Sequence, residues 1–142
     1  MALPETVVLD TSVLVRFFVP YADEDQPRAE ALRDGWLDDR VQLVQLDLSV
    51  YEFVNAVTRS LGHGSEQAAR EVGALYRLQM PIVQVDNALA VEAARLAAEI
   101  GLSGYDAAFV AAARRLDVPL VTCDRRLAAS AKEALLLTDL AA

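Results

Sequence analysis

The sequence predicts an α/β domain in which a parallel sheet of four to five strands is covered by helices on both faces. Short apolar runs alternate along the chain with segments of helical apolar periodicity. Strands that are separated by helices pair in parallel, and such sheets are buried on both sides. The core is expected to be aliphatic, because 54% of the residues are hydrophobic and only 6% are aromatic. A chain of 142 residues has the usual size of one domain, so residues 1–142 are assigned to one domain.

The first part of the chain is predicted to contain two strands and four helices. The run TVVL is typical of a buried strand, and Pro20 ends the short helix that follows it. Pro27 suits the first turn of the next helix, whose apolar face carries Ala29, Leu32, Trp36 and Leu37. Asp47 or Ser49, and later Ser65, are candidate N-caps, and Gly62 is a helix stop. In order, we expect a strand at Thr6–Leu9, helices at Thr11–Phe18 and Asp25–Arg40, a strand at Val41–Leu46, and helices at Leu48–Leu61 and Ser65–Gln79.

The second part continues the alternation. Asp86 can cap a strong helix that Gly101 ends, with an apolar stripe of Leu89, Ala93, Leu96 and Ile100. Proline precedes two of the strands. We expect a strand at Ile82–Val85, helices at Asn87–Ile100 and Ser103–Leu116, a strand at Leu120–Cys123, a helix at Arg125–Lys132 and an edge strand at Leu135–Leu137.

Two acidic residues directly follow predicted strands. Asp10 comes after TVVL and Asp124 after LVTC. Parallel sheets place their ligand sites just beyond the carboxyl ends of the strands, so both are candidate site residues. The alternative is that each only caps the next helix, which is the interpretation we give to Asp47 and Asp86.

Two further acids lie on helices that are otherwise largely apolar, Glu52 in LSVYEFVNAV and Asp106 in SGYDAAFVAAA. A carboxylate in such surroundings costs free energy unless it is paired or binds a cation, although Asp106 would also interact favourably with the helix dipole. If all four acids converge, a divalent cation offsets their repulsion, and oxygen ligands suit Mg²⁺ or Mn²⁺. The single histidine, His63, looks like a turn residue and the single cysteine, Cys123, like a core residue.

Three segments resemble the PIN domain, and especially the VapC-type toxins of toxin–antitoxin pairs: VVLDTSVLVRFF, LSVYEFVNAV and SGYDAAFVAAARRLDVPLVTCD. The resemblance runs from Val7 to about Leu137, and nothing is transferred to the variable segment Tyr21–Arg40. It implies a three-layer α/β/α sandwich. The family's acidic set falls on Asp10, Glu52, Asp106 and Asp124.

This resemblance implies an Mg²⁺- or Mn²⁺-dependent endoribonuclease that hydrolyses single-stranded RNA with a metal-activated water, giving a 5′-phosphate and a 3′-hydroxyl. Asp10, Asp106 and Asp124 would hold metal directly or through water, and Glu52 would hold metal or orient the attacking water. The hydroxyls of Thr11, Ser12 and Thr122 would support these carboxylates or waters. The sequence does not decide whether one metal ion or two would bind.

The net charge of −8 argues against broad binding to nucleic acid, which usually needs a basic surface. A local patch could still contact RNA, for which Arg16, Arg125 and Arg126 are the candidates, with Arg114 and Arg115 also considered. Solvated surface charge is the alternative for all of these arginines. Tyr105 or Phe17 could stack on a base, and core packing is the alternative for both.

The resemblance further implies a homodimer and a small antitoxin as partner. Helices Leu48–Leu61 and Glu66–Leu78 are the candidate contact faces, because their apolar positions exceed one stripe, and a cytoplasmic location is the default expectation. No apolar stretch of about 18 residues is present, so we expect no membrane span, and the N-terminus lacks the features of a signal peptide. A dehalogenase-type phosphatase would need an acid at Ser12, and a receiver domain an acid pair and a lysine after a strand. A PIN-type module that binds or processes RNA without an antitoxin stays open as the alternative function.

Overall fold

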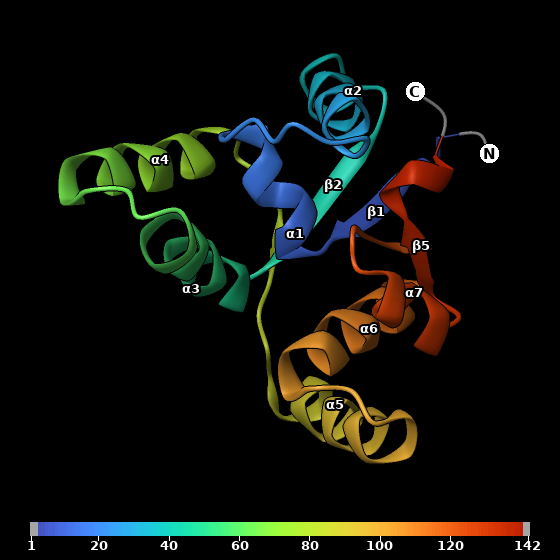
Figure 1. Cartoon of the computed structure of the whole chain (residues 1–142). Coiled ribbons are helices and arrows are strands. Elements are labelled where there is room, and N and C mark those ends of the chain that lie inside the picture. Colours follow the sequence, from blue (N-terminus) through green and yellow to red (C-terminus); the bar gives the residue numbers. More distant parts are fainter. Residues whose placement is uncertain (1–2, 141–142) are drawn as a thin grey trace.

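A five-stranded parallel sheet forms the centre of the computed structural model, which describes residues 3–140 (Figure 1). The strand order is β3–β2–β1–β4–β5, and every neighbouring pair is parallel. The predicted fold class is therefore confirmed. The strands are β1 (Thr6–Leu9), β2 (Gln42–Leu46), β3 (Ile82–Val83), β4 (Leu120–Thr122) and β5 (Ala134–Leu136).

Helices cover both faces of the sheet because successive strand residues point to opposite sides. On β1, Val7 and Leu9 face one apolar cluster and Val8 faces the other. The first cluster is completed by α1 (Thr11–Leu14) with its 3₁₀ turn η1 (Val15–Phe17), α2 (Gln26–Leu37), α3 (Leu48–Asn55), the π-helical turn η2 (Ala56–Ser60) and α4 (Ser65–Arg77). The second is completed by α5 (Asn87–Ile100), α6 (Gly104–Leu116) and α7 (Arg125–Ser130), and the 3₁₀ turn η3 (Leu137–Asp139) follows β5.

The helix Asn87–Ile100 was predicted with its correct ends. The Asp86 carboxylate accepts a hydrogen bond from the backbone N–H of Leu89 at 2.8 Å, and Gly101 adopts φ +74°, the left-handed conformation that ends helices. Ile100 is nevertheless partly exposed, unlike the three residues that precede it in the predicted stripe.

Several predicted ends and caps are wrong. The helix predicted to Arg40 ends at Leu37, because the chain turns at Asp39 (φ +58°), and Leu37 is 61% exposed. Ser65 does not cap α4, whose N-cap is Gly64. Asp47 stands at the N-cap position of α3, one of the two predicted alternatives, but its side chain accepts a hydrogen bond from Val85 N–H and none from the helix. Ser49 lies inside α3, where its hydroxyl accepts a hydrogen bond from Leu46 N–H. Of the strand predicted at Ile82–Val85, only Ile82 and Val83 form a strand, and the strand after Pro119 ends at Thr122, one residue before its predicted end.

Within residues 3–140, no single helix is long and apolar enough to cross a membrane, although α5 and α6, bent by 115°, meet that test when taken together.

Candidate active site

Asp10 lies at the carboxyl end of β1, where the neighbouring strand β4 also ends. Its backbone N–H donates to the carbonyl oxygen of Val121 at 3.0 Å, which ties the two strand ends together. The Asp10 side chain is almost fully buried, and its Oδ1 accepts a hydrogen bond from Thr11 N–H at 3.0 Å. Asp10 is thus both the N-cap of α1 and a carboxylate at the sheet edge.

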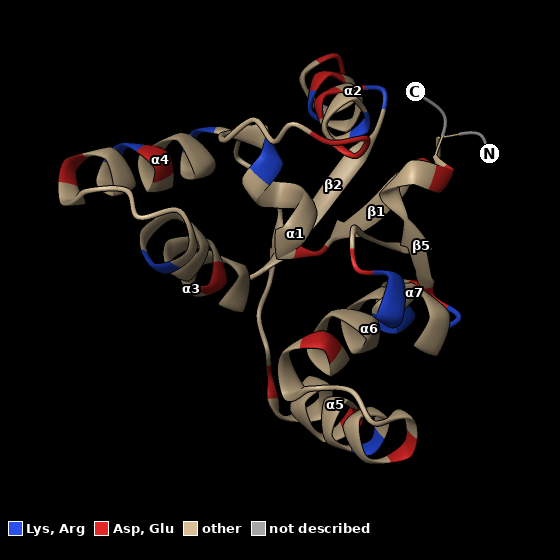
Figure 2. Ribbon diagram, in the orientation of Figure 1, with Lys and Arg blue, Asp and Glu red and all other residues tan. Residues whose placement is uncertain are grey.

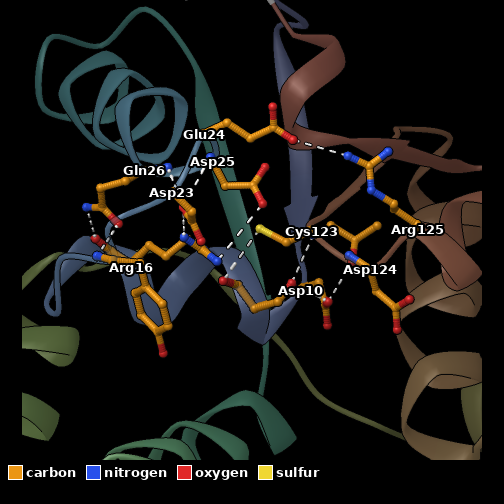
Figure 3. A network of polar contacts seen from close by, with 12 residues as sticks. Asp10, Arg16, Asp23, Glu24, Asp25, Gln26, Cys123, Asp124 and Arg125 are labelled. Carbon is orange, nitrogen blue, oxygen red and sulfur yellow. Dashed lines mark hydrogen bonds and ion pairs between the residues drawn. The ribbon is translucent and has the colours of Figure 1, made fainter.

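Two hydroxyls hold the other oxygen of this carboxylate. Ser12 Oγ and Thr122 Oγ1 each donate to Asp10 Oδ2 at 2.7 Å. Each hydroxyl also accepts a backbone N–H beyond β4, from Cys123 at 3.1 Å and from Asp124 at 3.0 Å respectively. Because a backbone N–H can only donate and an ionised carboxylate can only accept, the hydroxyl protons are directed to Asp10. Figure 3 shows Asp10 between Cys123 and Asp124.

Glu52, on α3, is connected to the Asp10 region by a hydrogen bond from Thr11, the residue that follows Asp10. Thr11 Oγ1 donates to Glu52 Oε1 at 2.8 Å. Burial raises the pKa of the Glu52 carboxyl, and the charges of Asp10 and Asp106 raise it further, whereas the hydrogen bond from Thr11 lowers it. The charges of Asp10, which follows β1, and of Asp106, on α6, therefore reach Glu52 on α3.

Asp106 lies in the first turn of α6, where its backbone N–H donates to the N-cap Ser103 at 3.1 Å. Burial raises the pKa of its carboxyl, as do the charges of Asp10 and Asp124, while Ser103 and Arg126 lower it. The Asp124 carboxylate caps α7, accepting from the backbone N–H groups of Arg126 and Leu127 at 2.9 and 3.3 Å. Asp124 therefore caps α7 and also lies beside the other acids, so both interpretations of this residue apply.

Two hollows lie over these acids. One of about 220 Å³ is lined by Asp106, Asp124 and Arg126. The other, of about 420 Å³, is lined by Asp10, Glu52 and Arg59. The second has the size of a small ligand site, roughly 300–1,000 Å³, and the first is smaller.

The donor set fits a hard divalent cation. All four acids offer oxygen ligands, the Cys123 thiol stays protonated because burial raises its pKa to about 11, and His63 contacts Glu71 at 2.7 Å. Among residues 3–140, no group of three or more acidic, histidine or cysteine side chains stands close enough to hold an ion directly. Mg²⁺ is usually held by one or two carboxylates and retains several waters, so a more widely spaced set suits it.

Arg16 does not lie on the open surface, which corrects its assignment as an RNA contact. The residue is 9% exposed, and its Nη1 lies 2.6 Å from Asp23 Oδ1 (Figure 3). Its guanidinium carbon lies 4.3 Å from the centre of the Tyr21 ring. Gln26 also donates to the Arg16 carbonyl oxygen at 3.1 Å. Arg16 therefore organises the segment before α2.

The other candidate contacts differ in their surroundings. Arg125 forms an exposed ion pair with Glu24 at 3.1 Å, whereas Arg126 lines the hollow of Asp106 and Asp124. Arg114 and Arg115 pair with acids at the other end of α6, about 12 Å along the helix from Asp106. Tyr105 is 63% exposed, whereas Phe17 is buried in the core, as its alternative predicted.

Sequence reasoning missed Asn55 and Arg59, which line the hollow of Asp10 and Glu52. They follow Glu52 by three and seven residues, the spacing that places side chains on one face of a helix. That spacing was the available signal.

Comparison with known proteins places this geometry in a family. The family model described as "PIN domain" matches residues 7–133. The chain is 33% identical over 102 residues to "Exonuclease VapC9" of Pyrobaculum aerophilum, covering 72% of this chain and 77% of the relative. The solved structure of PAE2754 from the same organism superposes with a TM-score of 0.68 at 28% identity, covering 94% of this chain and 89% of that one. A toxin–antitoxin complex from Klebsiella pneumoniae has the same fold, with a TM-score of 0.67 at 18% identity and coverage of 92% and 97%.

Proposed function

The chain belongs to the PIN-domain family, with VapC-type proteins among its relatives, and on that premise we propose that it is an Mg²⁺- or Mn²⁺-dependent endoribonuclease acting on single-stranded RNA. The supporting observation is the gathering of four acids at one sheet edge: two hydroxyls hold the Asp10 carboxylate, the charges of Asp10 and Asp124 raise the pKa of Asp106, and the charges of Asp10 and Asp106 raise that of Glu52. Carboxyls whose pKa is raised by burial and by neighbouring acids are candidates for a functional site.

In this proposal Asp10, Asp106 and Asp124 hold the cation, directly or through water, and Glu52 holds it or orients the attacking water. When bound, the cation lowers the pKa of water and offsets charge on the phosphoryl oxygens. Asp10 is pre-oriented, since Thr11 N–H and the hydroxyls of Ser12 and Thr122 fix both of its oxygens.

Glu52 is suited to contact the attacking water. Thr11 engages its Oε1, and among the residues that the structure describes none donates to its Oε2. That oxygen can accept a hydrogen bond from water, and the raised pKa of the carboxyl makes it a better proton acceptor. Attack on the phosphorus with departure of the 3′ oxygen leaves a 5′-phosphate and a 3′-hydroxyl.

The test is cleavage of end-labelled single-stranded RNA by the purified protein with Mg²⁺, Mn²⁺ or chelator. Asp10→Asn and Asp106→Asn should each lower the rate by at least about 100-fold, as loss of a key electrostatic element does. Asp34→Asn, an exposed acid on α2, is the matched control and should cleave normally. Cleavage that persists in both site variants, or in chelator, would overturn the proposal.

We further propose that this nuclease is the toxin of a toxin–antitoxin pair and forms a homodimer. The support is the similar fold of the Klebsiella pneumoniae toxin–antitoxin complex and a partly exposed aromatic surface on the predicted contact helices, with Tyr51 and Tyr76 beside Ile82. Induced expression should arrest growth, Asp10→Asn should not, and light scattering at micromolar concentration should give a dimer mass. Normal growth despite RNA cleavage would favour an RNA-processing nuclease without an antitoxin, and RNA binding without cleavage would favour a binding module.

A further inference from the structure

We propose that Arg59 and Arg126 bind the RNA phosphates on the two sides of the cleaved bond, so that the RNA backbone crosses the acidic edge from one arginine to the other. This inference rests on the proposed function and adds to it the residues that hold the substrate. It also requires the RNA to continue in both directions from the bond that is cut.

Ion pairs divide the 13 basic residues of this protein, whose net charge is −8, into two groups. Seven arginines form ion pairs with acids and are partly neutralised: Arg16, Arg33, Arg40, Arg95, Arg114, Arg115 and Arg125. Within residues 3–140, the basic side chains that form no such pair are Arg28, Arg59, Arg70, Arg77, Arg126 and Lys132.

Of these six, Arg59 and Arg126 line the hollows that contain the four acids. Arg59, on η2, shares a hollow with Asp10 and Glu52. Arg126, at the start of α7, shares the other with Asp106 and Asp124. Figure 2 shows basic segments on α7 and on the turn that continues α3, with acidic segments of β1, α3 and α6 between them.

Arg126 is the basic residue that lines the hollow of Asp106 and Asp124. Its guanidinium nevertheless forms no ion pair with the neighbouring Asp124, to which only its backbone N–H donates. Both guanidinium groups are therefore exposed cations beside carboxylates that do not neutralise them. A guanidinium in this state can bind a phosphate through two parallel hydrogen bonds.

RNA needs such groups here because the acidic cluster repels the phosphates on either side of the one that is cut. Affinity for a nucleic acid comes mainly from cations that neutralise its phosphates. One cation in each hollow supplies this attraction on both sides of the acids. A substrate that ends at the cleaved bond would engage only one of them, so internal bonds should be preferred.

The first experiment measures binding of fluorescently labelled single-stranded RNA by anisotropy, in Mg²⁺ and at several salt concentrations, with every protein carrying Asp10→Asn to prevent cleavage. Arg59→Ala and Arg126→Ala should each weaken binding several-fold, and each should lower the slope of log affinity against log salt by about 0.7. Arg70→Ala removes an exposed arginine of α4 that lines neither hollow, and it should change nothing. Melting temperatures should stay unchanged in all three variants, since these side chains are on the surface.

The second experiment places a neutral methylphosphonate at one linkage, either before or after the cleaved bond. Each neutral linkage should weaken binding to the protein that carries only Asp10→Asn. One of the two arginine variants should bind this RNA no more weakly than it binds unmodified RNA, because the missing charge was that arginine's partner. The linkage before the cleaved bond should identify one arginine in this way, and the linkage after it the other.

Binding and cleavage separate the two proposals. Unchanged salt slopes in both variants, in a protein whose wild-type form cleaves RNA, would overturn the arginine assignment and leave the nuclease intact. Reduced slopes together with a wild-type protein that never cleaves would support the RNA path and overturn the nuclease. A parent that does not bind RNA would overturn the arginine assignment directly.

Discussion

Replacing Thr122 with valine removes one hydroxyl at the junction of β1 and β4 while the side-chain volume stays almost the same. Thr122 is fully buried, and its Oγ1 both donates to Asp10 Oδ2 at 2.7 Å and accepts from Asp124 N–H at 3.0 Å. A hydrogen bond to a charged group contributes about 1.5–3 kcal/mol, and one between neutral groups about 1 kcal/mol. The variant should therefore lose about 3 kcal/mol of folding free energy and melt roughly 10 °C lower.

Thr122→Ser is the matched control. It keeps the hydroxyl and loses one buried methyl group, so it should cost only about 1 kcal/mol. Thermal unfolding followed by circular dichroism measures both variants. In the cleavage assay, Thr122→Val should also lose about 10- to 100-fold in activity or metal affinity, the usual effect of removing a group that orients a metal-holding carboxylate. If valine and serine variants unfold at the same temperature, the hydroxyl does not hold Asp10 as the distances indicate.

Four further predictions concern charge. A divalent cation at ten times its dissociation constant should stabilise the protein by about 1.4 kcal/mol, and Asp106→Asn should lose most of this gain. In chelator, Asp106→Asn should stabilise the protein instead of weakening it. The pKa of Asp106 is raised in the folded protein, so its negative charge lowers the folding stability at pH values above that pKa and has no effect below the ordinary value of 3.8. Asp106→Asn should then melt above the wild type at pH 7.5, with the gap closing toward pH 4, and an unchanged gap would contradict the assigned pKa direction. Cation binding, measured by calorimetry, should weaken as the pH falls, because protons compete with the cation for the carboxylates of Glu52 and Asp106, whose pKa values are raised. Equal affinities at pH 5 and pH 7.5 would count against these acids as ligands. Arg16→Met should lower stability by about 1–2 kcal/mol, because it removes the hydrogen bond to the partly exposed Asp23 and the contact with the Tyr21 ring, while the salt slope of RNA binding should stay unchanged; a lower slope would restore Arg16 as an RNA contact.

The elements that the sequence predicted best are those with local signals. Helix Asn87–Ile100 has its cap, its period and its terminating glycine within the element itself. Strand Thr6–Leu9 is a bounded apolar run, and the acids at strand ends follow from the position of each strand alone.

The elements that were predicted poorly depend on contacts with distant parts of the chain. Arg16 belongs to the helix after Asp10, but its partners Asp23 and Asp25 come from a segment without helical or strand periodicity. Asp47 and Asp86 both stand at helix N-cap positions, yet only the Asp86 side chain bonds to its helix, because the Asp47 carboxylate accepts a hydrogen bond from Val85 N–H instead. Arg59 depends on how α3 continues as a π-helical turn, which local propensity does not specify.

Internal cleavage is the central claim, and a circular single-stranded RNA tests it most directly because a circle has no ends. The relative with 33% identity carries the name exonuclease, so the two modes of attack need to be distinguished. The wild-type protein should open the circle with Mg²⁺ or Mn²⁺, leave it intact in chelator, and lose this activity in Asp10→Asn. A circle that stays closed while linear RNA of the same sequence is degraded from its ends would contradict the proposed endonuclease.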